Sequence, residues 1–280
     1  MLEDKKNEYI LTGKSGTIGK HFSSHGQATN FDITNQREVL KWFQEHDARD
    51  KSLVHLAAIV GDSKVKENFE NSKKVNVEGA ESVARIALDS GVNQFFFIST
   101  SHVYRPQNER IKEEGEIQPQ NDYAKLKREA EERIIEIFKG SSSKLVILRV
   151  FSVLDFYTND FTLGGKVTHA IQDRKQFHIE SALDERDFLT PKHVAQAIEF
   201  LISHRIPGGI YNLCSGVSRT VKEAVQEMLI RATFPVDWAI FDESYSNAPK
   251  VCGSNVKLLK LMPDLKPLLR WELSEFERII

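Results

Sequence analysis

The chain has 280 residues, enough for one large domain or for a domain with a smaller lobe, and a core of this size needs no cross-links. Its 38 basic and 40 acidic residues nearly balance, which argues against nucleic acid or a membrane as a partner and favours small molecules or other subunits. The two cysteines have no metal-ligand spacing and the charged N-terminus has no apolar signal core, so we expect no metal site and a cytoplasmic location.

The first predicted elements are a strand, a glycine-rich turn and a helix. An apolar run at 9–12 precedes Gly13, Gly16 and Gly19, and we expect a helix over about 16–24. A triphosphate-binding loop is excluded, because no glycine stands five positions before the glycine of either Gly-Lys pair. The remaining interpretations are a plain structural turn or a cradle in which glycines let the backbone approach the pyrophosphate of a dinucleotide.

Short apolar runs alternate with helical patterns along the first half of the chain. The runs are at 9–12, 52–58, 94–100 and 144–150, and the helical patterns are at 37–46, 77–91 and 123–138. Continuous apolar runs are typical of strands buried on both faces, so we predict an α/β fold with a doubly wound, Rossmann-like parallel sheet. Ligands of such folds bind at the carboxyl ends of the strands.

After about residue 155 the pattern loosens into shorter elements. Strands are predicted at 176–180, 209–213 and 237–241, and helices at 192–204 and 221–232. We therefore expect a dinucleotide-binding domain over 1–155 and a smaller substrate-binding lobe over 156–280, intertwined with the last elements of the sheet.

Tyr123 and Lys127 lie one turn apart on one face of a helix predicted to begin near Asn121 or Asp122. A phenol with an ordinary pKa near 10 is a poor acid or base at neutral pH, and lowering that pKa by about three units needs roughly 4 kcal/mol. A neighbouring ammonium and a positive nicotinamide ring could supply it. The alternative is a surface tyrosine beside one of many lysines.

Eight segments in order give the chain a family resemblance over nearly its whole length. They are TGKSGTIG at 12–19, HLAA at 55–58, NVEGA at 76–80, ISTSHVYRP at 98–106, YAKLK at 123–127, RVFSV at 149–153, RDF at 186–188 and YNLCSG at 211–216. With these segments the chain resembles the extended short-chain dehydrogenase/reductases, the group of nucleotide-sugar epimerases, dehydratases and reductases. The resemblance implies NAD(P)(H) as cofactor, a nucleotide sugar as substrate and a homodimer.

The resemblance assigns Thr100, Tyr123 and Lys127 as catalytic residues, because the family's hydroxyl lies three residues before the Val of the Val-Tyr pair. Ser101 and His102 stand where 4,6-dehydratases carry an Asp-Glu pair, which argues against a dehydratase. A cysteine matches His102 in epimerase-reductases that resemble GDP-fucose synthase. His102 is therefore expected to contact substrate or to move a proton, with packing beside the site as the alternative.

The resemblance also implies a cofactor-binding set. Its members are Gly13, Lys14, Gly16, Thr17, Ile18, Gly19, Asp32, Ile33, Leu56, Ala57, Ala58, Tyr123 and Lys127. The stretch between the last glycine and Asp32 is too short for a full second strand, its turn and a third strand, so part of the family's fold is deleted. Asp32 either contacts adenine together with Ile33 or ends a shortened second strand and binds the ribose.

Two further features bear on this cofactor-binding region. Asn35 and Glu38 have the spacing of a helix cap, which is compatible with either role of Asp32. Lys14 beside the pyrophosphate favours NADPH, although the choice between NAD and NADP stays open.

The expected substrate-binding residues are Ser101, His102, Ser152 and Arg186. A guanidinium at Arg186 would face the nucleotide diphosphate, or else form an ion pair with Asp184 or Glu185. The chain departs from the family pattern where Ser152 replaces an asparagine. Lys192-His193 replaces an Asp-Asp pair, and Arg105-Pro106 replaces the glycine after Val-Tyr.

The expected activity is NAD(P)H-dependent reduction of a nucleotide-linked keto sugar, in making a deoxysugar for a polysaccharide. The alternatives are an epimerase of the same fold and a non-catalytic dinucleotide-binding regulator.

Overall fold

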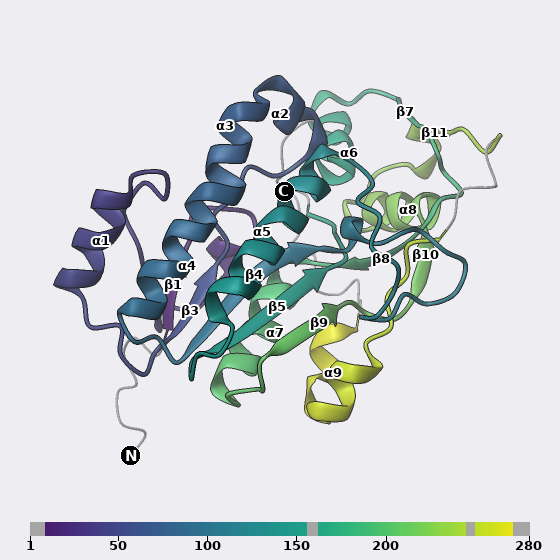
Figure 1. The fold of residues 1–280 in the computed structure, drawn as a ribbon. Helices are drawn as coiled ribbons and strands as arrows, with labels where there is room; N and C mark the ends of the chain where they lie inside the picture. Colours follow the sequence, from purple (N-terminus) through teal and green to yellow (C-terminus); the bar gives the residue numbers. More distant parts are fainter. Residues whose placement is uncertain (1–8, 156–161, 245–249, 271–280) are drawn as a thin grey trace, which may run out of the picture.

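The centre of the molecule is a six-stranded parallel sheet, seen in a computed structural model that describes residues 9–155, 162–244 and 250–270 (Figure 1). The strands lie in the order β2–β1–β3–β4–β5–β9. Their bounds are β1 Tyr9–Thr12, β2 Gly26–Ala28, β3 Ser52–His55, β4 Gln94–Thr100, β5 Lys144–Val150 and β9 Gly209–Leu213. This arrangement confirms the predicted doubly wound α/β fold.

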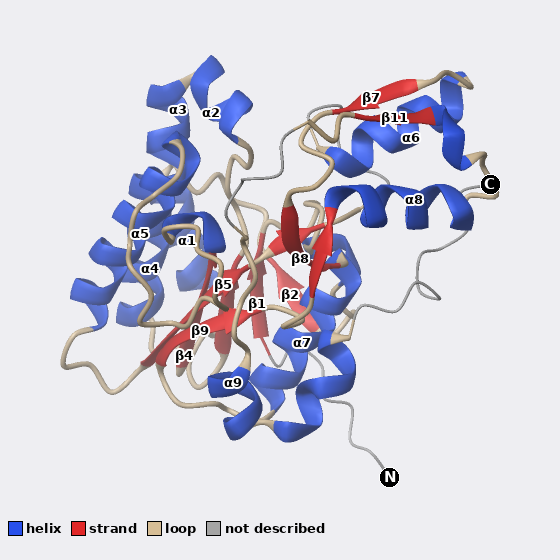
Figure 2. Cartoon of the chain, turned by 90° about the vertical axis from the view of Figure 1, so that its right-hand side faces the viewer, coloured by secondary structure: helices blue, strands red, loops and turns tan. Residues whose placement is uncertain are grey.

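Helices cover both faces of the sheet, which explains its continuous apolar runs (Figure 2). Helices α1 (Gln36–Glu45), α4 (Ala80–Asp89) and α5 (Asp122–Phe138) pack on one face, and α7 (Pro191–Ser203) packs on the other. Each face of the sheet has its own apolar cluster. Phe95 and Phe97 of β4 belong to the cluster under α1, α4 and α5, Phe96 belongs to the cluster under α7, and all three are fully buried. No helix within the described ranges is long and apolar enough to span a membrane.

The helix predicted at 77–91 is the last part of a longer helical run. Helices α2 (Asp62–Glu67) and α3 (Phe69–Lys73) precede it, and a π-helical segment at Lys74–Gly79 joins α3 to α4. The buried side chain of Asn76, in this segment, donates to Ile59 O (2.8 Å) and accepts from Ile59 N (2.7 Å). One amide side chain therefore ties the loop after β3 to the helical run.

A smaller layer lies beyond the carboxyl ends of the central strands (Figure 2). It contains β6 Ser152–Val153, α6 Leu163–Asp173, β7 Phe177–Ile179, β8 Glu185–Leu189, β10 Ser218–Thr220, α8 Val221–Arg231 and β11 Ala239–Phe241. Its strands form two small sheets, β10–β8–β6 and β11–β7, over an apolar cluster of their own. Helix α7 and strand β9 return to the main sheet, and α9 (Val256–Leu261) follows, so a boundary at residue 155 stays a prediction.

The prediction of a helix over 16–24 is wrong. Only a 3₁₀ turn at Gly19–His21 forms there, and β2 begins at Gly26. Two charged side chains hold the chain just after that turn: Lys14 Nζ donates to Phe22 O (2.5 Å), and Glu199 of α7 accepts from Ser23 N (2.9 Å). These contacts turn the chain toward β2 before a second helical turn can form.

Candidate active site

The glycine-rich turn between β1 and the 3₁₀ turn is too tight for side chains at two of its three glycines. Gly13 has a φ of +72°, and a Cβ there would lie 2.7 Å from Ala57 N. A Cβ on Gly19 would lie 2.2 Å from Gly13 O, whereas one on Gly16 would lie 3.2 Å from it. Gly13 and Gly19 therefore let the turn close against the loop after β3, the geometry that a dinucleotide cradle requires.

A cavity of about 530 Å³ opens beside this turn, within the size range of small-molecule sites. Its lining residues are Thr12, Gly13, Lys14, Ser15, Thr29, Phe31, Asp32, Ile33, Ala57, Ala58, Ile59 and Val75. Six of the predicted cofactor residues are among them. Backbone from the turn, an apolar floor and few charges suit a dinucleotide, so the residues present fit the predicted cofactor.

Both charged side chains in this lining already have protein partners. The Lys14 ammonium donates to Phe22 O (2.5 Å) and Ser23 O (3.5 Å). The Asp32 carboxylate accepts from Thr34 N (2.8 Å) and Thr34 Oγ1 (2.9 Å), and these bonds lower its pKa. One alternative placed Asp32 at the end of a shortened second strand. That placement is wrong, because β2 ends at Ala28.

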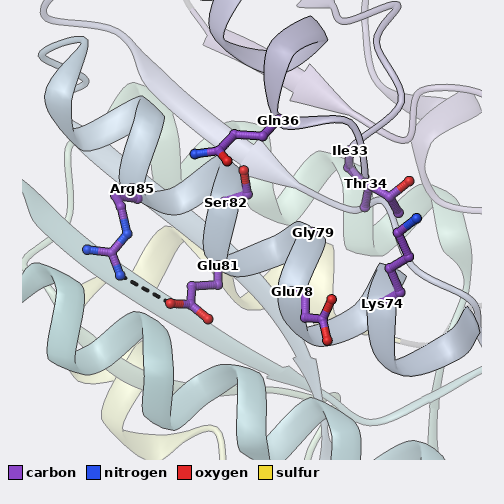
Figure 3. Close-up of a pocket in the computed structure, with 9 residues that line it drawn as sticks. All are labelled: Ile33, Thr34, Gln36, Lys74, Glu78, Gly79, Glu81, Ser82 and Arg85. Atoms are coloured by element: carbon purple, nitrogen blue, oxygen red, sulfur yellow. Dashed lines mark hydrogen bonds and ion pairs between the residues drawn. The ribbon is translucent and has the colours of Figure 1, made fainter. Parts of the chain in front are cut away.

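A second cavity of about 270 Å³ adjoins the first and shares Ile33 with it (Figure 3). It lies between the start of α1 and the run from the π-helical segment into α4. In Figure 3 the side chain of Lys74 points toward Thr34, while Arg85 is bound to Glu81 (3.1 Å). Asn35 occupies the N-cap position of α1, but the predicted capping hydrogen bond does not form, because its Nδ2 donates to Glu38 Oε1 (2.7 Å).

Thr100, Ser101 and His102 lie together in a short turn at the end of β4. Thr100 Oγ1 accepts from His102 N (3.3 Å) and so caps the 3₁₀ turn Ser101–Val103. Ser101 is 2% exposed, and its hydroxyl has no hydrogen-bond partner among the described residues. His102 Nδ1 lies 3.4 Å from Asn121 Nδ2, at the start of α5. The end of β4 and the start of α5 are thus in contact.

Helix α5 begins where the sequence predicted and carries Tyr123 and Lys127 toward β4. Asn121 is its N-cap and accepts from Ala124 N (2.8 Å). Lys127 is 2% exposed, its Nζ lies 3.9 Å from the centroid of the Phe97 ring, and burial lowers its pKa to about 7. Burial raises the pKa of the half-buried Tyr123, the opposite of the shift expected from a neighbouring ammonium.

A buried ion pair joins α5 to the neighbouring strand β5. Glu131, one turn after Lys127, accepts from Arg149 Nη2 (2.7 Å) and Nε (3.0 Å) of β5. It also accepts from Ser99 Oγ (2.5 Å), which removes that hydroxyl from the candidates for catalysis. Arg128 Nη1 also donates to Glu131 (3.0 Å), so loss of Glu131 would leave the buried Arg149 charge without its carboxylate, whereas loss of Arg149 would still leave Glu131 one partner.

His55 of β3 is a buried, neutral neighbour of Lys127. Its Nδ1 lies 3.1 Å from Thr12 Oγ1, and its ring stacks on Phe97 with centroids 6.1 Å apart. Burial and the Lys127 charge lower its pKa to about 3.

On the side of the smaller layer, Arg186 of β8 forms the ion pair that was its alternative interpretation, with Asp184 Oδ2 (2.8 Å). Its charge still lowers the pKa of His102, after the larger effect of burial. Ser152 lies on β6, which pairs with β8. Asp187, next to Arg186, accepts from Gly216 N (2.8 Å) and so joins the RDF segment to the YNLCSG segment.

Sequence reasoning missed part of the cavity and included residues outside its lining. Thr29, Phe31, Ile59 and Val75 line it without having been predicted, although two of them directly adjoin predicted residues. The predicted Gly16, Thr17, Ile18, Gly19, Leu56, Tyr123 and Lys127 are not in its lining. Leu56 packs instead against the apolar cluster beneath α7, because its side chain points to the other face of the sheet.

Comparison with protein families gives one match that covers most of the chain. The model of the NAD dependent epimerase/dehydratase family matches residues 2–214. The chain is 25% identical over 242 residues to GDP-6-deoxy-D-mannose reductase of Pseudomonas aeruginosa, covering 78% of this chain and 77% of that protein. It is 26% identical over 287 residues to a UDP-glucose 4-epimerase of Rhizobium leguminosarum bv. trifolii, covering 82% and 84%.

Solved structures match the whole architecture at lower identity. RMD from Pseudomonas aeruginosa complexed with NADPH aligns with a TM-score of 0.79 and 20% identity, over 94% of this chain and 98% of that one. DesIV from Streptomyces venezuelae, a dTDP-glucose 4,6-dehydratase with NAD and TYD bound, aligns with a TM-score of 0.79 and 15% identity, over 96% and 94%. At these identities the likeness concerns the fold.

Proposed function

Because the chain belongs to the NAD-dependent epimerase/dehydratase family, we propose that it is an NAD(P)H-dependent reductase of a nucleotide-linked 4-keto sugar. The chain is an enzyme of the NAD(P)-dependent nucleotide-sugar group, which removes the alternative of a non-catalytic regulator. The reductase type rests on similarity to GDP-6-deoxy-D-mannose reductase over about three quarters of both chains. We propose that the product serves as a deoxysugar for a polysaccharide.

The observation that carries the proposal is the contact between the end of β4 and the start of α5, where His102 Nδ1 lies 3.4 Å from Asn121 Nδ2. We assign the proton transfer to Tyr123. Burial raises its pKa above the ordinary value near 10, so the phenol keeps its proton at neutral pH, as a donor to a carbonyl oxygen must. When bound, the nicotinamide would supply the hydride to the carbonyl carbon.

Thr100 and Lys127 support that transfer in this proposal. The Thr100 hydroxyl accepts from a backbone amide, and no described residue takes its proton, so it can donate to the same carbonyl oxygen. Lys127, held over Phe97, would stabilise the phenolate that remains after Tyr123 has given up its proton. The cradle glycines with Ala57 and Ala58 would hold the cofactor.

On the substrate side we assign contacts to Ser101, His102, Ser152 and Arg186. Ser101 has a buried hydroxyl that a substrate oxygen could satisfy. The neutral imidazole of His102 next to the Arg186 charge suits a polar, anionic ligand. The lack of a carboxylate at positions 101 and 102 disfavours a dehydratase.

The test is turnover by the purified protein of GDP-, UDP-, dTDP- and CDP-linked 4-keto sugars with NADH or NADPH, followed by nicotinamide absorbance. Consumption of one equivalent of reduced cofactor per sugar supports the reductase. No consumption with any of these sugars overturns it.

A UDP-glucose 4-epimerase is the second candidate, because the chain is as similar to one such enzyme, over more than four fifths of both chains. An epimerase keeps its cofactor bound and shows no net consumption. Retention of cofactor through purification, with interconversion of UDP-glucose and UDP-galactose, would replace the reductase proposal.

NADPH is our proposed preference over NADH, through Lys14 at the cavity wall. Its ammonium would have to exchange its bonds to two backbone carbonyls for a phosphate. If the preference is real, Lys14→Gln weakens NADPH binding several-fold more than NADH binding, measured by fluorescence titration. Equal effects on both cofactors would remove this preference.

We also propose a homodimer through the outer faces of α4 and α5. Ion pairs already cross these faces, from Arg133 to Glu81 and to Glu129 (2.7 Å each), beside the 38% exposed Ile135. Light scattering should give twice the mass of the chain, and a monomer mass at working concentration would contradict this part of the proposal.

A further inference from the structure

We infer that Asp62 is a positioning residue that ties the helix bearing Tyr123 to the segment lining the cofactor cavity. The inference rests on the proposed function, because it concerns the placement of the group assigned to proton transfer. Asp62 is the first residue of α2, and it lies sixty positions before the helix that it contacts.

The carboxylate of Asp62 caps the first turn of α5 from outside that helix. Its Oδ1 accepts from Asp122 N (3.1 Å), and its Oδ2 accepts from Lys66 Nζ (2.6 Å). The Lys66 ammonium and the backbone amides of Asp122 and Tyr123 lower the pKa of Asp62, so the carboxylate stays ionised at neutral pH. The first amides of a helix have no partner within the helix, so this contact satisfies one of them in addition to the Asn121 cap and ties the start of α5 to α2.

The other end of the link is the cavity wall. Ile59 lines the cavity, and Asn76 holds both its N–H and its carbonyl. Only Val60 and Gly61 separate Ile59 from Asp62, and Gly61 has a φ of +101°, which only glycine adopts easily. The segment from Ile59 to Asp62 is therefore short and fixed at both of its ends.

Tyr123 shares an apolar cluster with Ile59, the first residue of this segment. Tyr123 and Ile59 both contact an apolar cluster of Val65 on α2, Val77 and Leu126 on α5. Release of the Asp62 contact would thus free α2 and α5 to shift relative to each other at the position of the phenol. A displacement of about 1 Å in an active site can lower the rate about a hundred-fold.

The first experiment compares Asp62→Ala and Asp62→Asn with a matched control, Asp122→Asn. The control removes one negative charge from the same turn of α5, and its carboxylate contacts the exposed Lys125 (2.8 Å) but not α2. We expect Asp62→Ala to lower kcat about ten- to a hundred-fold while the Kd for NAD(P)H changes by less than about threefold. Asp62→Asn, whose amide oxygen can still accept from Asp122 N, should recover most of that loss.

Two kinetic outcomes would overturn the inference. One is a kcat for Asp62→Ala that equals that of Asp122→Asn. The other is an Asp62→Asn variant as slow as Asp62→Ala, because the charge would then matter and the geometry would not. Melting temperatures of all variants, with kcat measured well below them, separate slow turnover from partial unfolding.

A readout without turnover keeps this inference separate from the proposed function. If wild-type protein reduces no keto sugar, the proposed function fails while the contact can still be measured by hydrogen exchange. We expect the amides of Asp122 and Tyr123 to exchange at least about tenfold faster in Asp62→Ala than in Asp122→Asn. Equal exchange in the two variants would overturn the assignment of Asp62 whatever the activity.

Discussion

The end of the site assigned to chemistry and the end assigned to adenosine are held in place in different ways. At the chemical end, the seven-residue β4 meets the 17-residue α5, and the fully buried Glu131–Arg149 pair joins that helix to β5. At the end assigned to adenosine, the elements are a three-residue β2 and a three-residue 3₁₀ turn. The shortest elements of the site therefore lie in the part that would hold the cofactor, and the longest lie in the part assigned to chemistry.

The contrast predicts that single substitutions at the chemical end have larger effects. The largest is expected for Tyr123→Phe, which keeps the ring in its apolar cluster and removes the proton. Turnover should fall by about 10²–10⁴-fold with little change in cofactor affinity, as is usual when a general acid is lost. The control is Tyr211→Phe, which removes a hydroxyl that donates to Pro207 O, and its turnover should stay close to that of wild type. Unchanged kcat in Tyr123→Phe would end the assignment.

Next comes the buried ion pair. Glu131→Ala leaves the Arg149 charge without its partner in the core, so we expect a loss of about 3–5 kcal/mol in the free energy of unfolding, measured with denaturant. Glu132→Ala breaks only the pair with Arg128 at the surface and should cost at most about 0.5 kcal/mol. If the two losses are similar, the buried pair is not what anchors α5.

Lys127→Met should have opposite effects on stability and activity. The Lys127 pKa of about 7 is below its ordinary value near 10.5, so between these pH values the unfolded chain binds the additional proton and stability rises with pH. The variant should lose that rise, gain about 2 kcal/mol at pH 7, and lose turnover. Denaturant unfolding curves at pH 7 and pH 9.5 measure the free energy of unfolding of both proteins. If that free energy changes equally with pH in wild type and variant, the pKa of Lys127 is not lowered by burial.

The smallest effect is expected at the adenosine end. Gly19→Ala places a Cβ 2.2 Å from Gly13 O, so the turn must open, and NAD(P)H affinity should fall about five- to tenfold, roughly 1 kcal/mol. Gly16→Ala, with a contact of 3.2 Å, should change affinity less. Calorimetric titration compares the two, and the reverse order would mean that the cofactor does not lie against this turn.

The sequence predicted the central strands and the catalytic helix closely. Strands β4 and β5 have the predicted bounds, because uninterrupted apolar runs bury both faces of a parallel strand. Helix α5 begins at its predicted cap, Asn121, whose side chain supplies a local signal. These predictions succeeded because burial pattern and capping are properties of neighbouring residues.

The predictions that failed depend on contacts between distant residues. The helix over 16–24 gave way to a 3₁₀ turn held partly by Glu199, which lies on α7. Burial raises the pKa of Tyr123, whereas the predicted lowering also requires a positive nicotinamide ring and stays a prediction. Phe31 and Val75 both line the cavity although they lie far apart in the sequence, so local patterns did not point to them together.

The short length of β2 also affects how readily the protein aggregates through its sheet. An outer strand with free amide and carbonyl groups invites pairing with strands of other molecules, and a run of three residues offers few such groups. At the opposite margin, Lys257 of α9 donates to Ile210 O of β9 (2.9 Å) and occupies a group that a foreign strand would need. Both margins of the sheet are thereby poor templates for β-aggregation.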